Sequence, residues 1–80
     1  MNREEIFEKL NVVFRDVFDD DSIVVNDNTT ADDLEDWDSL EHINLIVAIE
    51  KAFGIKLAMK DIVSLKNVGE MVTVISSKIS

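Results

Sequence analysis

Apolar residues near the N-terminus recur with the period of an α-helix, and the residues around them mark its two ends. The apolar set lies on one helical face: Ile6, Phe7, Leu10, Val13, Phe14, Val17 and Phe18. Asn2 with Glu5 three residues later is typical of a capping box. The pattern predicts a helix from about Arg3 to Phe18. Three consecutive Asp residues at 19–21 should end it, because acidic groups at a helix C-terminus oppose the helix dipole.

A second helix is predicted from residue 39 to about Phe53. Asp38 is placed as its N-cap, and Glu41 at the N3 position would complete a second capping box. Gly54 supplies the left-handed residue that commonly follows a helix.

The last part of the chain predicts one short helical turn and one longer helix. Residues 55–66 leave room for a turn near Met59 to Ser64, and Asn67 can cap the helix after it. The core stripe of that last helix would be Val68, Met71, Val72, Ile75 and Ile79.

Residues 19–37 form a long polar connection, and such a stretch in a small domain is usually functional or held down. We expect five apolar residues to pack it back onto the helices: Ile23, Val24, Val25, Leu34 and Trp37.

The predicted fold class is therefore all-α, a four-helix bundle of three main helices and one short helix, with a long first loop. A chain of 80 residues buries only about 60% of its unfolded surface, so residues 1–80 should form a single domain. The expected core is Leu10, Val13, Leu45, Ile49, Val68, Val72 and Ile75, with Phe7, Phe14 and Phe53 around it.

The second helix carries two apolar stripes instead of one. With Ser39 at 0° and about 100° per residue, Leu45, Ile49, Ala52 and Phe53 fall between about 220° and 320°. Leu40, Ile43 and Val47 fall between about 40° and 100°. So small a domain cannot easily bury both stripes. The second one, flanked by Glu41 and Glu50, indicates a docking surface for a partner, unless the short helix covers it.

Composition and charge exclude several classes of protein. Seventeen acidic against eight basic residues give a net charge of −9, which disfavours nucleic acid and anionic membranes as partners. The absence of Cys excludes disulfides and thiolate metal sites. The longest apolar run, residues 45–49, is far shorter than the roughly 20 residues of a membrane span. Acidic residues also interrupt the N-terminal segment where a signal peptide would be apolar, so we expect a cytoplasmic protein. We also expect it to be a monomer.

The charge is segregated along the chain. Residues 16–50 carry twelve acidic residues and no Lys or Arg, whereas residues 51–80 carry five Lys against Asp61 and Glu70. This favours either a surface addressed to a basic partner or a merely solubilising acidic surface.

Ser39 is the candidate for chemistry, because it lies in the first turn of the second helix. Unpaired N–H groups and the positive end of the dipole would stabilise a phosphate there, although Ser39 could simply share the cap with Asp38. A hydrolase would use Asp38, Ser39 and His42, but no oxyanion hole is evident. His42 also leans toward the core stripe, where a packed, hydrogen-bonded His is common. A calcium-binding EF-hand loop would need a Gly that residues 16–38 lack.

The segment DWDSLEHINLIVAIEKAFGI resembles the attachment region of acyl carrier proteins. Asp38, Ser39 and Leu40 match the Asp-Ser-Leu motif of that family, whose Ser receives a 4′-phosphopantetheine arm. The spacing that follows the motif is matched by Leu45, Ile49, Glu50, Phe53 and Ile55. The resemblance implies that Ser39 carries the arm, that Asp38 helps to present it, and that the protein is a carrier and not an enzyme.

The resemblance also implies partners. These are a Mg²⁺-dependent phosphopantetheinyl transferase, and acyl ligases, synthases or acyltransferases with basic docking patches, in fatty acid, polyketide or related biosynthesis. The implied docking residues are Leu40, Glu41, Ile43, Val47, Glu50 and Ile62. An acyl chain is expected to find shelter between the second helix and its neighbours. The alternatives are an aminoacyl carrier and an interaction module that is not modified at Ser39.

The chain departs from the usual family pattern at three places. Glu35 and Asp36 stand where Leu-Gly is common, Trp37 stands where a small residue is frequent, and no Pro precedes the third-helix region. That region is usually acidic, but here it carries Lys56, Lys60 and Lys66. These departures favour a discrete carrier from a specialised pathway, which housekeeping fatty-acid enzymes would use poorly.

Overall fold

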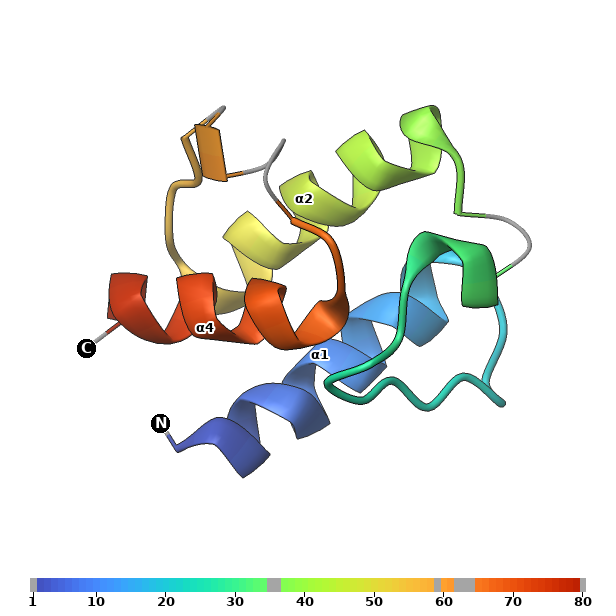
Figure 1. Ribbon diagram of the computed structural model, residues 1–80, viewed down its shortest axis with the longest axis horizontal. Helices are drawn as coiled ribbons and strands as arrows, with labels where there is room; N and C mark the ends of the chain where they lie inside the picture. The colour runs from blue at the N-terminus through green and yellow to red at the C-terminus, as the bar shows by residue number, and fades with distance from the viewer. Residues whose placement is uncertain (1, 35–36, 59, 62–64, 80) are drawn as a thin grey trace.

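The computed structural model describes residues 2–34, 37–58, 60–61 and 65–79, and within them the fold is all-α, as predicted. The elements in these ranges are α1 (Arg3–Val17), the 3₁₀ turn η1 (Ala31–Asp33), α2 (Ser39–Phe53) and α4 (Val68–Ile79). Both α2 and α4 pack on α1, and both chain ends lie at the same side of the molecule (Figure 1). The backbone is helical at residues 60–61 of the expected short turn, and its residues 59 and 62–64 lie outside the described ranges.

The two ends of α1 follow from local hydrogen bonds. The capping box forms as predicted: the Glu5 N–H donates to Asn2 Oδ1 at 2.8 Å, and the Asn2 N–H donates to Glu5 Oε1 at 3.1 Å. After Val17 the chain turns at Asp19, whose φ of 51° is left-handed, and the Asp20 N–H donates back to the Arg15 carbonyl at 3.0 Å. The helix thus ends through a Schellman-type turn at the first of the three Asp residues.

The capping box predicted for α2 is only half formed. The Glu41 N–H donates to Asp38 Oδ1 at 2.8 Å, but the Glu41 carboxylate accepts from the Asn44 side-chain amide at 3.3 Å instead of from the Asp38 N–H. Asn44, three residues further on the same face, offers a competing donor. The other end agrees with the prediction, since Gly54 is left-handed with φ 66°.

The core lies where the three helices meet, and all seven predicted central residues are buried in it. Phe14 was expected at its edge but is fully buried. Its ring contacts Phe18 at a centroid distance of 5.8 Å and Trp37 at 5.3 Å. The core cluster is Ile6, Leu10, Val13, Phe14, Ile23, Val25, Leu45, Ile49, Val68, Met71, Val72 and Ile75.

The long first loop is held along α1, although one expected anchor is wrong. Ile23 and Val25 are buried, whereas Val24 is 71% exposed, because successive side chains of an extended segment point to opposite sides. Arg15 Nε donates to the Ile23 carbonyl at 2.7 Å, and the Val25 N–H donates to Asn11 Oδ1 at 2.7 Å. The two other expected anchors, Leu34 and Trp37, pack partly buried against the core.

The same loop reaches the start of α4 and closes it. The Val68 N–H donates to the Thr29 carbonyl at 2.8 Å, and the Gly69 N–H donates to the Asp27 carbonyl at 3.1 Å. Arg3 adds an ion pair with Asp27. We call the contact made by Asp27, Thr29, Val68 and Gly69 the loop–α4 joint.

Candidate functional site

Ser39 is exposed at the first position of α2, and the N–H groups beside it are open. Asp38 serves the third and fourth donors of the helix, through its side chain to the Glu41 N–H and its carbonyl to the His42 N–H at 2.9 Å. Among the described residues, the N–H groups of Ser39 and Leu40 have no acceptor, as expected of a first helical turn.

At the start of α4, in contrast, the first N–H groups all have acceptors. In addition to the two joint hydrogen bonds, the Glu70 N–H donates to Asn67 Oδ1 at 2.8 Å and the Met71 N–H donates to the Asn67 carbonyl at 3.3 Å. All four donors of its first turn are therefore satisfied. Of these two helix N-termini, only that of α2 keeps N–H groups and a positive dipole end available for an anion.

An aromatic pair holds the residue before Asp38 in place. Trp37 Nε1–H donates to His42 Nδ1 at 3.0 Å, and the two rings stack with centroids 5.8 Å apart. Trp37 and His42 occupy the N′ and N4 positions of α2, so they form a hydrogen-bonded version of the hydrophobic staple. The sequence prediction missed this pair, although the staple spacing could have revealed it. The prediction of a packed, hydrogen-bonded His42 is confirmed.

The same contact bears on the hydrolase alternative. His42 Nδ1 accepts from Trp37, and no hydrogen bond joins His42 to Ser39 among the described residues.

The described ranges also hold no cluster of three His, Cys, Asp or Glu side chains that could bind a metal ion. None of the helices described is both long and apolar enough to cross a membrane.

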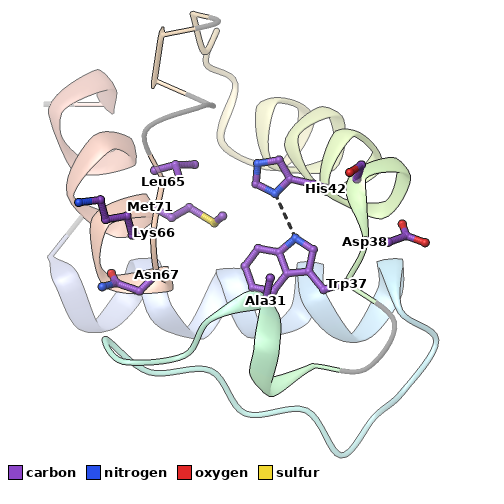
Figure 2. A pocket seen from close by; sticks show the side chains of 9 residues that line it. Ala31, Trp37, Asp38, His42, Leu65, Lys66, Asn67 and Met71 are labelled. Atoms are coloured by element: carbon purple, nitrogen blue, oxygen red, sulfur yellow. Dashed lines mark hydrogen bonds between the residues drawn. The ribbon is translucent and has the colours of Figure 1, made fainter.

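A pocket of about 540 Å³ opens beside Ser39, between the start of α2 and the start of α4 (Figure 2). We call it the Ser39 pocket. Its lining residues are Ala31, Trp37, Asp38, Ser39, His42, Leu65, Lys66, Asn67 and Met71. The sequence prediction did not bring the loop at Ala31 and the residues before α4 to this place, because their contacts are distant in sequence.

The second apolar stripe of α2 is exposed, as the helical angles predicted. The exposed fractions of Leu40, Ile43 and Val47 are 66%, 60% and 46%. Glu41 and Glu50 flank the stripe but are half-buried, and Glu50 Oε2 accepts from the Leu57 N–H at 2.8 Å. Glu50 therefore fixes the chain after α2 as well as carrying charge. Ile62, the sixth expected docking residue, lies outside the described ranges.

Comparison with known proteins places the chain in a family. The family model for the phosphopantetheine attachment site matches residues 8–75. The chain belongs to the acyl carrier protein family. The acyl carrier protein of Petrotoga mobilis is 33% identical over 81 residues, covering 100% of this chain and 94% of that protein. For the acyl carrier protein of Guillardia theta the identity is 36% over 81 residues, covering 100% and 99%.

A solved structure is similar to this chain in both fold and sequence. The solution structure of holo acyl carrier protein from Geobacter metallireducens has a TM-score of 0.87 and 45% identity, covering 91% of this chain and 84% of that one. The expected all-α carrier fold is thereby confirmed. As a member of this family the chain is a carrier that holds its cargo on phosphopantetheine.

Proposed function

We propose that Ser39 is the attachment point of the 4′-phosphopantetheine arm and that the protein presents acyl groups, bound to that arm, to partner enzymes. The observation that carries the proposal is an exposed serine at a helix N-terminus whose first N–H groups have no acceptor among the described residues. The arm supplies the thiol that binds an acyl group as a thioester, and the chain itself has no Cys.

The residues around Ser39 fit a phosphate ester at that position. The N–H groups of Ser39 and Leu40 and the dipole of α2 favour a negative charge there. Asp38 keeps the first turn in shape through its bond to the Glu41 N–H, and Ser39 is exposed beside it. The exposed Asp38 carboxylate is also available to the Mg²⁺-dependent transferase.

Docking is proposed to occur on the exposed stripe of α2. Leu40, Ile43 and Val47 would supply the apolar contact, Glu41 and Glu50 the acidic rim, and Ile62 a further apolar contact. The partners inferred are the phosphopantetheinyl transferase and the ligases, synthases or acyltransferases of a specialised cytoplasmic pathway. Such a surface has the apolar centre and polar rim of a transient interface.

The attachment is tested by intact mass after incubation with a phosphopantetheinyl transferase and coenzyme A. The wild-type protein should gain the mass of one phosphopantetheine group, and the Ser39→Ala variant should gain none. Ser77→Ala, which removes another exposed serine, is the matched control and should react like the wild type. Circular dichroism should show the same helix content for all three proteins.

Three outcomes would contradict the proposal or a part of it. An unchanged wild-type mass with several transferases would favour an interaction module that is not modified. Equal mass gain in Ser39→Ala would place the arm elsewhere. If the arm is attached but only an amino-acid ligase loads it, the protein is an aminoacyl carrier and the acyl assignment is wrong.

A further inference from the structure

Trp37 is tied to three parts of the molecule at the point where the first loop enters α2. Its indole ring packs edge-to-face against Phe14 with centroids 5.3 Å apart and contacts Phe18 at 6.3 Å, both from α1. Its backbone N–H donates to the Leu34 carbonyl at 3.1 Å, and its Nε1–H donates to His42 Nδ1 at 3.0 Å (Figure 2). Since Phe14 is fully buried, Trp37 connects the core with the first turn of α2.

Ser39 lies inside the short stretch of chain that this side-chain bond spans. Trp37 precedes Ser39 by two residues and His42 follows it by three. The Asp38 cap acts within the same stretch, through the Glu41 N–H. The end turns of helices fray with opening free energies close to zero, so they are open for much of the time unless something holds them. A side-chain bond that spans the turn therefore raises the fraction of molecules in which the turn is formed.

The bond depends on the protonation state of His42. A neutral imidazole has one acceptor nitrogen, whereas an imidazolium carries a proton on both nitrogens and can only donate. A proton on Nδ1 would face the indole N–H, donor against donor. His42 is only half-buried, so solvent protons reach the ring. The bond should therefore be present while the imidazole is neutral and be lost as the pH falls through the range in which imidazole titrates, about pH 8 to 5.

The charges near His42 come from the start of its own helix and from the segment before α4. Asp38 and Lys66 line the Ser39 pocket with it, and Figure 2 shows both side chains directed away from the imidazole. Glu41, its neighbour along the chain, accepts from Asn44. Within the described ranges the imidazole has no charged hydrogen-bond partner, so Trp37 is the partner that protonation removes. The residues that α1 and the loop bring to the pair are uncharged: Phe14, Phe18 and Ala31.

We propose that Trp37 and His42 are positioning residues for the modification of Ser39, and that the pair acts only while His42 is neutral. The bonded pair holds the first turn of α2 in the form in which the transferase meets Ser39, and protonation of His42 releases that turn. Neither ring has to touch the transferase or coenzyme A. The inference rests on the proposed function, because the reaction it concerns is the attachment of the arm.

The first measurement follows the pair itself in the protein without the arm. Trp37 and His42 are the only tryptophan and the only histidine of the chain, so each ring gives one set of NMR signals. His42→Gln is the reference at each pH, because its amide oxygen accepts a hydrogen bond but does not titrate. Relative to His42→Gln, protection of the indole N–H from solvent exchange should fall about three- to tenfold as the imidazole is protonated, the factor that corresponds to one hydrogen bond of ordinary net strength.

The second measurement is a double-mutant cycle on the transferase reaction, with Trp37→Phe, His42→Leu and the double variant. Trp37→Phe keeps a ring against Phe14 but has no N–H. At about pH 8 each single variant should lower kcat/KM by about three- to tenfold, and the double variant should lose no more than either. The loss should appear in KM, because fewer molecules present the formed turn while the chemistry after binding is unchanged.

The pH dependence separates positioning from simple packing. At about pH 5.5 the wild type should react like the two single variants, so that the coupling between Trp37 and His42 disappears. His42→Gln should keep most of the wild-type kcat/KM at pH 8 and should retain it at pH 5.5. Each ratio compares proteins with the same transferase at the same pH, so the titration of the enzyme cancels. Circular dichroism should show the same helix content for every variant.

The outcomes separate this inference from the proposed function. If the arm attaches but the single variants react like the wild type, the positioning role is overturned and the carrier role stands. Coupling that is equal at both pH values, or a loss that His42→Gln does not restore, would show a packing contact only and would also overturn it. If no arm attaches at Ser39 in the wild type, the proposed function fails first and the inference fails with it.

Discussion

Gly69 occupies a position that has no room for a side chain. A Cβ atom there would lie 2.8 Å from the backbone carbonyl oxygen of Asp27 and 2.8 Å from Asp27 Oδ1. Gly54 differs, because its Cβ would meet nothing within 4 Å and only its φ of 66° disfavours a side chain. The two glycines are thus required for different reasons, a close approach and a left-handed backbone.

We predict that Gly69→Ala destabilises the fold by about 1–2 kcal/mol. Alanine is the better helix former by about 1 kcal/mol, so a net loss requires that the clash with the Asp27 backbone outweighs this gain. Urea unfolding followed by circular dichroism measures the difference.

The control for this prediction is Gly54→Ala, which should cost about 1 kcal/mol through its left-handed backbone alone. Only Gly69→Ala should weaken the hydrogen bonds of the loop–α4 joint. This weakening should appear as faster hydrogen exchange at the Val68 amide. A Gly69→Ala protein as stable as the wild type would show that the joint yields without cost.

At the scale of elements, α2 carries two apolar stripes, one buried in the core and one exposed. The exposed stripe is the surface on which docking is proposed. Val47→Asp should reduce kcat/KM of the phosphopantetheinyl transferase reaction about fivefold or more, since about 1 kcal/mol of apolar contact is lost. The kinetic assay uses the transferase that modifies the wild type.

Val12 provides a matched control for that variant, because it is an equally apolar side chain, 61% exposed, on α1. Val12→Asp should leave kcat/KM within twofold of the wild type. Equal losses in both variants would mean that the stripe of α2 has no special role in docking.

The helices could be predicted from the sequence because their signals are local. The apolar spacing, the caps at Asn2 and Asp38, and Gly54 each act within one or two turns. The position of Ser39 in the first turn of α2 could be predicted for the same reason.

What could not be predicted depends on competition or on distant contacts. Glu41 turns to Asn44 because two donors compete for one carboxylate. Val24 is exposed because the loop is extended there, which apolar content does not reveal. The loop–α4 joint joins segments about forty residues apart, and the Ser39 pocket joins segments more than twenty residues apart. No spacing rule encodes such pairs.

At the scale of the whole molecule, the exposed charge changes sign along the chain. α2 opens in a segment with no Lys or Arg before residue 51, while Lys56, Lys60 and Lys66 are exposed after it. A basic partner patch that spans both regions would be attracted at one end and repelled at the other. Exposed rim charges of this kind change association rates and salt dependence more than final affinity.

We therefore predict that the double reversal Lys56→Glu with Lys60→Glu raises the rate at which a housekeeping fatty-acid acyltransferase uses the holo-protein at low salt. The gain should fade toward 1 M salt, where the Debye length is about 3 Å. Activity is measured at both salt concentrations with the wild type as reference. No gain at low salt would make these lysines irrelevant to partner choice.

The loop–α4 joint also divides the chain mechanically. The hydrogen bond from the Val68 N–H to the Thr29 carbonyl, with its neighbour at Gly69, makes residues 30–67 a loop that is closed at its base. Ser39 lies inside that loop, so tension applied at Ser39 by a retreating partner is transmitted to the joint before it reaches either chain terminus. Once α2 has been pulled off α1, the neck of this closed loop is therefore the next point on the backbone path that would bear the load.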